Sequence, residues 1–340
     1  MKLFRIMWGL VKIGLPEPLV GAIYRGRLAE VDGRAIDPKA QALSDLVALV
    51  RDPAVQMTVE QSRKQLAGFV ARFDLPGPDV RRTDIELPGA EGPRAARLYQ
   101  PESGGKAGTL LYLHGGGWIQ GSIDSHDALC AKLAAGADVR VISYDYRLAP
   151  EHKYPSASDD ILAAYLGLIG GAGKVKAEPG KLVVGGDSAG GNLTAAICLM
   201  AKESGDFTPL GQLMSYPFLD GVTPAEDKLE PHSIFPAARL RAFSVCYAGV
   251  EENLYNPLLS PVLASDEALT GLPPALIITA GLDPLRFEAR KYAARLIGLG
   301  NDVTVRQYAD ADHGFLIACQ SRFAEARAEI LRWLAALYDR

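Results

Sequence analysis

Apolar residues recur at helical spacing through the first 75 residues of the chain. The apolar side chains of the opening segment share one stripe: Leu3, Ile6, Met7, Leu10 and Val11. Such spacing predicts an amphipathic helix whose stripe packs against another element. Helical periodicity continues from residue 36 to residue 75 without a strand signal. We therefore expect residues 1 to 75 to be helical.

From residue 76 onwards the pattern changes to short apolar runs separated by helical stretches. Eight runs have the length and composition of strands: Asp84 to Leu87, Ala95 to Tyr99, Thr109 to Leu113, Arg140 to Tyr144, Lys181 to Val184, Gln212 to Ser215, Ala275 to Ala280 and Val303 to Tyr308. Strands that alternate with helices predict an α/β fold with a mostly parallel sheet covered by helices. Glycines and Pro93 between the first two runs predict an antiparallel hairpin at the start of this sheet.

The alternation lapses between residues 217 and 256. A polar, proline-bearing stretch there leads into a predicted helix, Ala237 to Tyr247. We interpret this stretch as an insertion that forms a second cap piece. The predicted organisation is thus an N-terminal helical cap segment, residues 1 to 75, and a catalytic domain, residues 76 to 340, that carries the insertion. The N-terminal stripe and the inserted helix are both expected over the mouth of the site.

Composition narrows the classes of partner. The formal net charge of -4 gives no broad basic surface, so nucleic acid is not expected as a partner. The four cysteines form no CxxC pair, and no clustered His, Asp and Glu pattern indicates a metal site. Lys2, Arg5 and Lys12 interrupt the apolar start, which disfavours a signal peptide, and no run is long enough to span a membrane. We expect a cytoplasmic protein, with a homodimer as one assembly it can form.

Gly186 to Gly190 read Gly-Asp-Ser-Ala-Gly and fit the G-x-S-x-G pattern. In that pattern a serine sits on a strained turn between a strand and a helix. The pattern alone arises by chance roughly 0.17 times in a chain of this composition. Here the expected context is present, because an apolar strand precedes Ser188 and an apolar helix follows it. Ser188 is therefore the candidate nucleophile.

A second motif, His-Gly-Gly-Gly-Trp, begins at His114 directly after a predicted strand. Its chance frequency is far lower, roughly 5 in 100,000 chains of this composition. Acyl transfer passes through a tetrahedral oxyanion, which backbone N–H groups of glycines can stabilise. We expect Gly115 and Gly116 to donate two of these hydrogen bonds, and Ala189, at the start of the helix, to donate the third. His114 is interpreted as an anchor of the loop and not as a base.

A serine nucleophile needs a histidine base and a carboxylate that orients it, and in this arrangement the chain order is Ser, acid, His. Of the two histidines after Ser188, His232 falls in the predicted insertion, whereas His313 follows the last strand. His313 is therefore the predicted base. Asp283 is preferred as the acid because it follows an apolar strand and precedes a helix start. Asp310 and Asp312 stay open as alternatives.

Together these segments resemble the hormone-sensitive-lipase-like family of bacterial esterases. The resemblance covers about residues 100 to 340 and rests on five motifs: HGGGW, YRLAPEHKYPSA (Tyr146 to Ala157), GDSAGGNL (Gly186 to Leu193), DPLR (Asp283 to Arg286) and HGF (His313 to Phe315). It implies the α/β-hydrolase fold, a triad of Ser188, Asp283 and His313, and a mainly helical cap. Family members commonly continue DPLR with Asp-Glu-Gly, where this chain has Phe287-Glu288-Ala289. That departure bears on substrate choice.

The resulting hypothesis is a serine esterase that hydrolyses short to medium acyl esters through an acyl-enzyme, without cofactor or metal. Its only predicted partner besides a second copy is the small-molecule ester. An amidase, deacetylase or lyase-like relative is the alternative, because leaving-group preference resides in pocket shape. A third hypothesis is a small-ligand receptor, as the plant gibberellin receptors resemble this family but lack the catalytic histidine. The presence of His313 argues against it.

Overall fold

The computed structural model describes residues 2–31, 33–50, 58–73, 76–105, 107–171, 175–228, 233, 235, 237–317 and 322–339. Its centre is one eight-stranded sheet in the order β10-β9-β8-β7-β5-β6-β4-β3. The strands are β3 (Arg81–Gly89), β4 (Gly92–Gln100), β5 (Thr109–Leu113), β6 (Arg140–Tyr144), β7 (Leu182–Asp187), β8 (Gln212–Ser215), β9 (Ala275–Ala280) and β10 (Val303–Tyr308). The eight predicted strands are confirmed, as is the antiparallel hairpin β3–β4.

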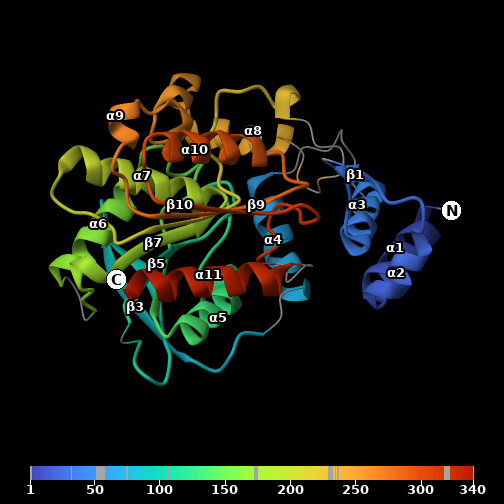
Figure 1. Cartoon of the computed structure of the whole chain (residues 1–340), viewed down its shortest axis with the longest axis horizontal. Helices are drawn as coiled ribbons and strands as arrows, with labels where there is room; N and C mark the ends of the chain where they lie inside the picture. The colour runs from blue at the N-terminus through green and yellow to red at the C-terminus, as the bar shows by residue number, and fades with distance from the viewer. Residues whose placement is uncertain are drawn as a thin grey trace.

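Helices cover both faces of this sheet (Figure 1). One face carries α6 (Ser156–Gly170), α7 (Ala189–Ser204) and α10 (Arg286–Gly298), and the other carries α5 (Asp127–Ala137) and α11 (Phe323–Tyr338). A short α9 (Asp266–Leu269) precedes β9. Among the described residues are also five 3-10 helices: η1 (Asp124–His126), η2 (Pro179–Lys181), η3 (Ala225–Lys228), η4 (Glu251–Tyr255) and η5 (Pro261–Leu263).

Strand β5 shows why the sequence folds this way. All five of its residues are buried, with Leu110 and Tyr112 in one apolar cluster and Leu111 and Leu113 in the other. Side chains alternate across a strand, so a wholly apolar run requires helices on both faces. Parallel strands also bring their carboxyl ends to the same edge, where ligands bind in sheets of this kind. The loops after β5, β7, β9 and β10 are therefore the ones that meet there.

The N-terminal segment differs from its prediction in two ways. Besides the helices α1 (Lys2–Gly14), α2 (Glu17–Ile23), α3 (Pro38–Val50) and α4 (Val59–Phe73), it holds a small antiparallel pair, β1 (Glu30–Val31) and β2 (Arg34–Ala35). Two residues per strand are too few to leave an alternating pattern in the sequence. The second difference concerns α1. It packs on α3 through Gly9, where an added Cβ would lie 2.9 Å from Leu46 Cδ1.

The apolar stripe of α1 is consequently turned outward. Leu3 is 71% exposed and Met7 59%. The expectation that this stripe is buried over the site is wrong. The side of α1 that packs on α3 is the opposite one, which carries Gly9. Instead, α4 from the N-terminal segment and α8 (Ala237–Ala248) from the insertion contribute to the pocket described below.

Candidate active site

Ser188 occupies the turn between β7 and α7. Its backbone has φ 54° and ψ -115°, a conformation that L-residues rarely adopt. The flanking glycines allow this turn to pass close to β5, since a Cβ on Gly190 would lie 1.9 Å from the carbonyl oxygen of Leu113. The turn projects the Ser188 side chain at the carboxyl edge of the sheet. The strand, turn and helix predicted from the sequence around Ser188 are all present.

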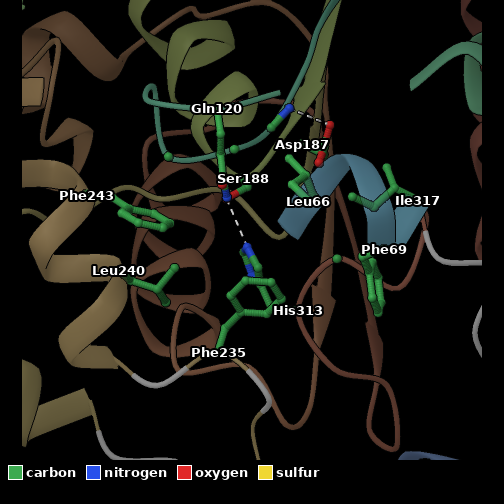
Figure 2. A pocket seen from close by; sticks show the side chains of 14 residues that line it. Leu66, Phe69, Gln120, Asp187, Ser188, Phe235, Leu240, Phe243, His313 and Ile317 are labelled. Carbon is green, nitrogen blue, oxygen red and sulfur yellow. Dashed lines mark hydrogen bonds between the residues drawn. The ribbon is translucent and has the colours of Figure 1, made fainter. Parts of the chain in front are cut away.

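The loops after β9 and β10 bring the other two predicted side chains to Ser188. His313 Nε2 lies 2.9 Å from Ser188 Oγ, an interaction drawn as a dashed line in Figure 2. On its other side, His313 Nδ1 lies 2.7 Å from Asp283 Oδ2. The remaining carboxylate oxygen, Asp283 Oδ1, accepts the backbone N–H of Leu285 at 2.8 Å. Both distances to His313 are within hydrogen-bonding range, so a proton can pass from the hydroxyl to an imidazole that a carboxylate holds in place.

Electrostatics favour a protonated His313 once a proton has been transferred. Burial acts to lower the pKa of His313, but the charge of Asp283 and its hydrogen bond, aided by Asp312, raise this pKa above its ordinary value. The carboxylate of Asp312 has other hydrogen-bond donors. It accepts the backbone N–H of His313 at 2.6 Å and the hydroxyl of Ser233 at 2.8 Å. The other alternative acid, Asp310, pairs with Arg322 at 2.8 Å.

The geometry of the glycine loop after β5 bears on the predicted oxyanion donors. Gly115 donates its N–H to Asp187 Oδ1 at 3.0 Å, so that group is not available to an oxyanion. Among the described residues, no acceptor takes the N–H of Gly116, Gly117 or Ala189. Gly116 and Gly117 also line the pocket around Ser188. Gly116, Gly117 and Ala189 are therefore described residues of this site whose N–H groups are free.

A buried polar network lies behind this loop. The Asp187 carboxylate also accepts the hydroxyl of Tyr112 at 2.9 Å and lies 3.0 Å from His126 Nε2. Burial acts to raise the pKa of Asp187, yet these neighbours hold it below its ordinary value, which keeps the carboxylate ionised. His114 stacks on Tyr146, and burial lowers its pKa to about 4. These contacts agree with the interpretation of His114 as a loop anchor.

The pocket in front of Ser188 is mostly apolar. It encloses about 540 Å³ of space not filled by atoms, its open mouth included. Its apolar side chains come from both cap pieces and from the loop after β10 (Figure 2): Leu66, Phe69, Phe235, Leu240, Phe243 and Ile317. Sequence periodicity identified α4 as a helix but carried no signal that Leu66 and Phe69 face the nucleophile.

Polar contacts connect helices α4 and α8 to the site. Ser62 on α4 donates its hydroxyl to Gln120 at 2.7 Å, and Gln120 closes the turn that begins at Gly116. Arg239 on α8 donates to Ser62 at 3.3 Å and to Gln65 at 3.1 Å. Helices α4 and α8 thus touch each other, and α4 also touches the glycine loop.

The remaining predictions concern His232, the cysteines, metal sites and membrane-spanning helices. His232 and Cys319 lie outside the described residues, whereas Cys130 and Cys198 are buried free thiols. Within the described ranges, no group of three His, Cys, Asp or Glu side chains is arranged to hold a metal ion. None of the helices in these ranges combines the length and apolar composition needed to cross a bilayer.

Comparison with known proteins gives a consistent result. A family profile for the alpha/beta hydrolase fold matches residues 110 to 317. The chain is 36% identical over 337 residues to the carboxylic ester hydrolase LipN of Mycobacterium tuberculosis, covering 92% of this chain and 87% of that protein. It is 36% identical over 226 residues to the ethyl acetate hydrolase of Pseudomonas putida, covering 65% and 70% of the two chains.

The fold also matches a solved structure along most of its length. The ester-hydrolase EH1AB1 from the metagenome of Lake Arreo, in complex with a derivative of bipyridine phosphonate, superimposes with a TM-score of 0.82 and 33% sequence identity. The match covers 89% of this chain and 99% of the other.

Proposed function

We infer that this chain, which belongs to the hormone-sensitive-lipase-like branch of the α/β-hydrolase family and is a serine carboxylesterase, uses Ser188, His313 and Asp283 as its catalytic triad. The observation that carries this proposal is the unbroken contact from Ser188 Oγ through His313 to Asp283, at 2.9 and 2.7 Å. A serine hydroxyl becomes nucleophilic when a neighbouring base takes its proton, and both distances suit that transfer.

The proposed reaction has two halves. Ser188 Oγ attacks the ester carbonyl carbon while His313 Nε2 accepts the hydroxyl proton. The negative charge that develops on the carbonyl oxygen is stabilised by the N–H groups of Gly116, Gly117 and Ala189, the last at the positive end of α7. His313 then gives its proton to the departing alcohol. Water, activated by His313, hydrolyses the acyl-enzyme in the second half.

We propose esters with short to medium acyl chains as the substrates. The apolar walls supplied by α4, α8 and Ile317 favour an alkyl group and bound the space available to it. The ethyl acetate hydrolase of Pseudomonas putida, a relative named for a short ester, supports this range. A cytoplasmic location and a homodimer stay predictions. Cell fractionation tests the first, and light scattering of the purified protein tests the second.

The test of the nucleophile uses Ser188→Ala and an organophosphonate. The variant should keep its circular dichroism spectrum and lose turnover of p-nitrophenyl esters, because no other group replaces the hydroxyl. In the wild type, mass spectrometry should locate the phosphonate adduct on Ser188. Retention of most turnover in the variant, or an adduct on another residue, would refute the assignment.

A further inference from the structure

Helix α1 presents an apolar face that no described part of the chain covers. Its six exposed apolar side chains range from 41% to 74% exposed: Leu3, Phe4, Met7, Trp8, Leu10 and Val11. In a helix of 100° per residue, these positions fall within one arc of about 160°. Exposed apolar side chains scattered singly are ordinary, but a contiguous face of this kind marks an interaction surface.

The packing of α1 fixes the direction of this face. Gly9 lies on the opposite side of the helix and approaches Leu46 of α3 so closely that an added Cβ would lie 2.9 Å from Leu46 Cδ1. Turning the apolar face inward would bring bulky side chains to this contact. Figure 1 shows α1 and α2 at the outer end of the molecule, away from the sheet. No residue of α1 lines the catalytic pocket.

The charge of the segment that carries this face indicates the kind of partner. Residues 2 to 27 contain one anion, Glu17, and five cations: Lys2, Arg5, Lys12, Arg25 and Arg27. This segment therefore has a net charge of +4 in a chain whose net charge is -4. Lys12 is engaged with Asp45 at 3.7 Å, but the other four cations are exposed.

We propose that the apolar face of α1 docks on an anionic lipid surface. An amphipathic helix with cations on its polar side binds in the interfacial plane by burying its apolar face and attracting acidic headgroups. Trp8, 46% exposed at the edge of the face, is a residue type that favours this interface. A second copy of the chain fits less well, because pairing two such faces would bring two segments of +4 charge together.

The experiment uses the full-length protein and sedimentation with large unilamellar vesicles. Vesicles that contain phosphatidylglycerol should bind the protein, and vesicles of phosphatidylcholine alone should bind it weakly. High salt should weaken binding to the anionic vesicles. Phe4→Glu and Val11→Glu should each lower vesicle binding by about tenfold or more, because each replaces a side chain that enters the apolar layer.

The matched control is Leu166→Glu, which places the same charge on an exposed apolar position of α6. It should bind vesicles like the wild type, and all three variants should retain turnover of soluble esters. Trp8 emission should shift to the blue on binding, and Trp8→Phe should bind without that shift. Absence of binding to anionic vesicles, or equal loss in Leu166→Glu, would overturn the proposal. A concentration-dependent dimer abolished by Phe4→Glu, without vesicle binding, would assign the face to a second copy.

Discussion

Gly115 donates its backbone N–H to the carboxylate of Asp187 over 3.0 Å, which joins the glycine loop after β5 to the turn that carries the nucleophile. Asp187 immediately precedes Ser188, so the contact sets the position of the loop relative to Ser188. Gly116 and Gly117 in the same loop keep free N–H groups. The carboxylate of Asp187 is thus a positioning group for two parts of the site at once.

Replacing Asp187 with alanine should therefore lower kcat by about 10²-fold, because misplacing one oxyanion donor has an effect of about that size. KM should change little, since the apolar side chains that line the pocket are unchanged. Tyr112→Phe is the matched control, because it removes one hydrogen bond from the same carboxylate and leaves the Gly115 contact in place. Steady-state kinetics on p-nitrophenyl butyrate measure both. An equal loss of kcat in the two variants would argue that the hydrogen bonds of Asp187 act only through the stability of the fold.

Asp283→Asn should lower kcat by about 10³–10⁴-fold, because the amide no longer holds the imidazole in the required tautomer. Asp312→Asn should be mild, since an amide oxygen still accepts the backbone N–H of His313. Asp310→Asn removes a pair with Arg322 away from the ring and should also be mild. The acid assignment fails if Asp312→Asn proves as damaging as Asp283→Asn.

The dependence of kcat/KM on pH should report the raised pKa of His313. The base acts only when neutral, so activity should fall as the pH drops through a midpoint above the ordinary value of 6.5. Asp283→Asn removes the main cause of the raised pKa of His313 and leaves the effect of burial, which lowers that pKa. The midpoint of the variant should therefore move to lower pH. Rates with a soluble ester across the stable pH range measure both midpoints. A wild-type midpoint below 6.5 would contradict the electrostatics described here.

Leu66→Ala and Phe69→Ala should shift the preferred acyl chain to greater length. The wild type should prefer chains of about four to eight carbons, since each methylene that fits contributes about 0.8 kcal/mol, or about fourfold in kcat/KM. Removing a wall of the pocket lets further methylenes fit. Lys64→Ala, on the exposed side of α4, is the control. Identical chain-length profiles in all four proteins would show that α4 does not bound the acyl site.

A buried ion pair between Lys228 Nζ and Glu288 Oε2, at 2.5 Å, joins the insertion to α10. Glu288 also accepts the N–H of Leu219 at 2.6 Å. Lys228→Met should lower the free energy of unfolding by about 3–5 kcal/mol, because it leaves a buried carboxylate without its partner. Lys228→Met/Glu288→Gln should recover much of this loss. Chemical denaturation measures the free energy of unfolding of both variants. An unchanged free energy of unfolding in Lys228→Met would refute the importance of the pair.

The same pair predicts a pH dependence. Burial raises the pKa of Glu288 to about 7, against 4.5 for an ordinary glutamate. The folded state therefore retains a proton that the unfolded state releases, and stability from this group declines as the pH rises from 4.5 through 7. Without Lys228 the pKa of Glu288 should rise further and the decline should continue to higher pH, so Lys228→Met should be harmed less at pH 5.5 than at pH 8. A pH-independent effect of Lys228→Met would contradict this.

The sheet and the proposed triad could be predicted from the sequence for identifiable reasons. Runs such as Thr109 to Leu113 are apolar throughout, and His313 and Asp283 are preferred because each follows a predicted strand. The sequence did not predict which glycine amide is engaged, because Gly115, Gly116 and Gly117 are chemically identical until Asp187 is placed beside one of them. Nor did periodicity reveal the outward stripe of α1, since amphipathicity does not specify what lies on the apolar side.

Arg239 reaches from α8 to Ser62 on α4, a contact between residues 177 positions apart in the sequence. The wall that faces the acyl chain is consequently built from two separate segments, α4 and α8, whose contacting side chains must be complementary. A chimera that takes only one cap piece from a relative should combine mismatched halves and lose turnover of both parental substrates. Exchange of α4 and α8 together replaces more residues than exchange of one helix, but it should disturb the structure less because the contact between the two helices is kept.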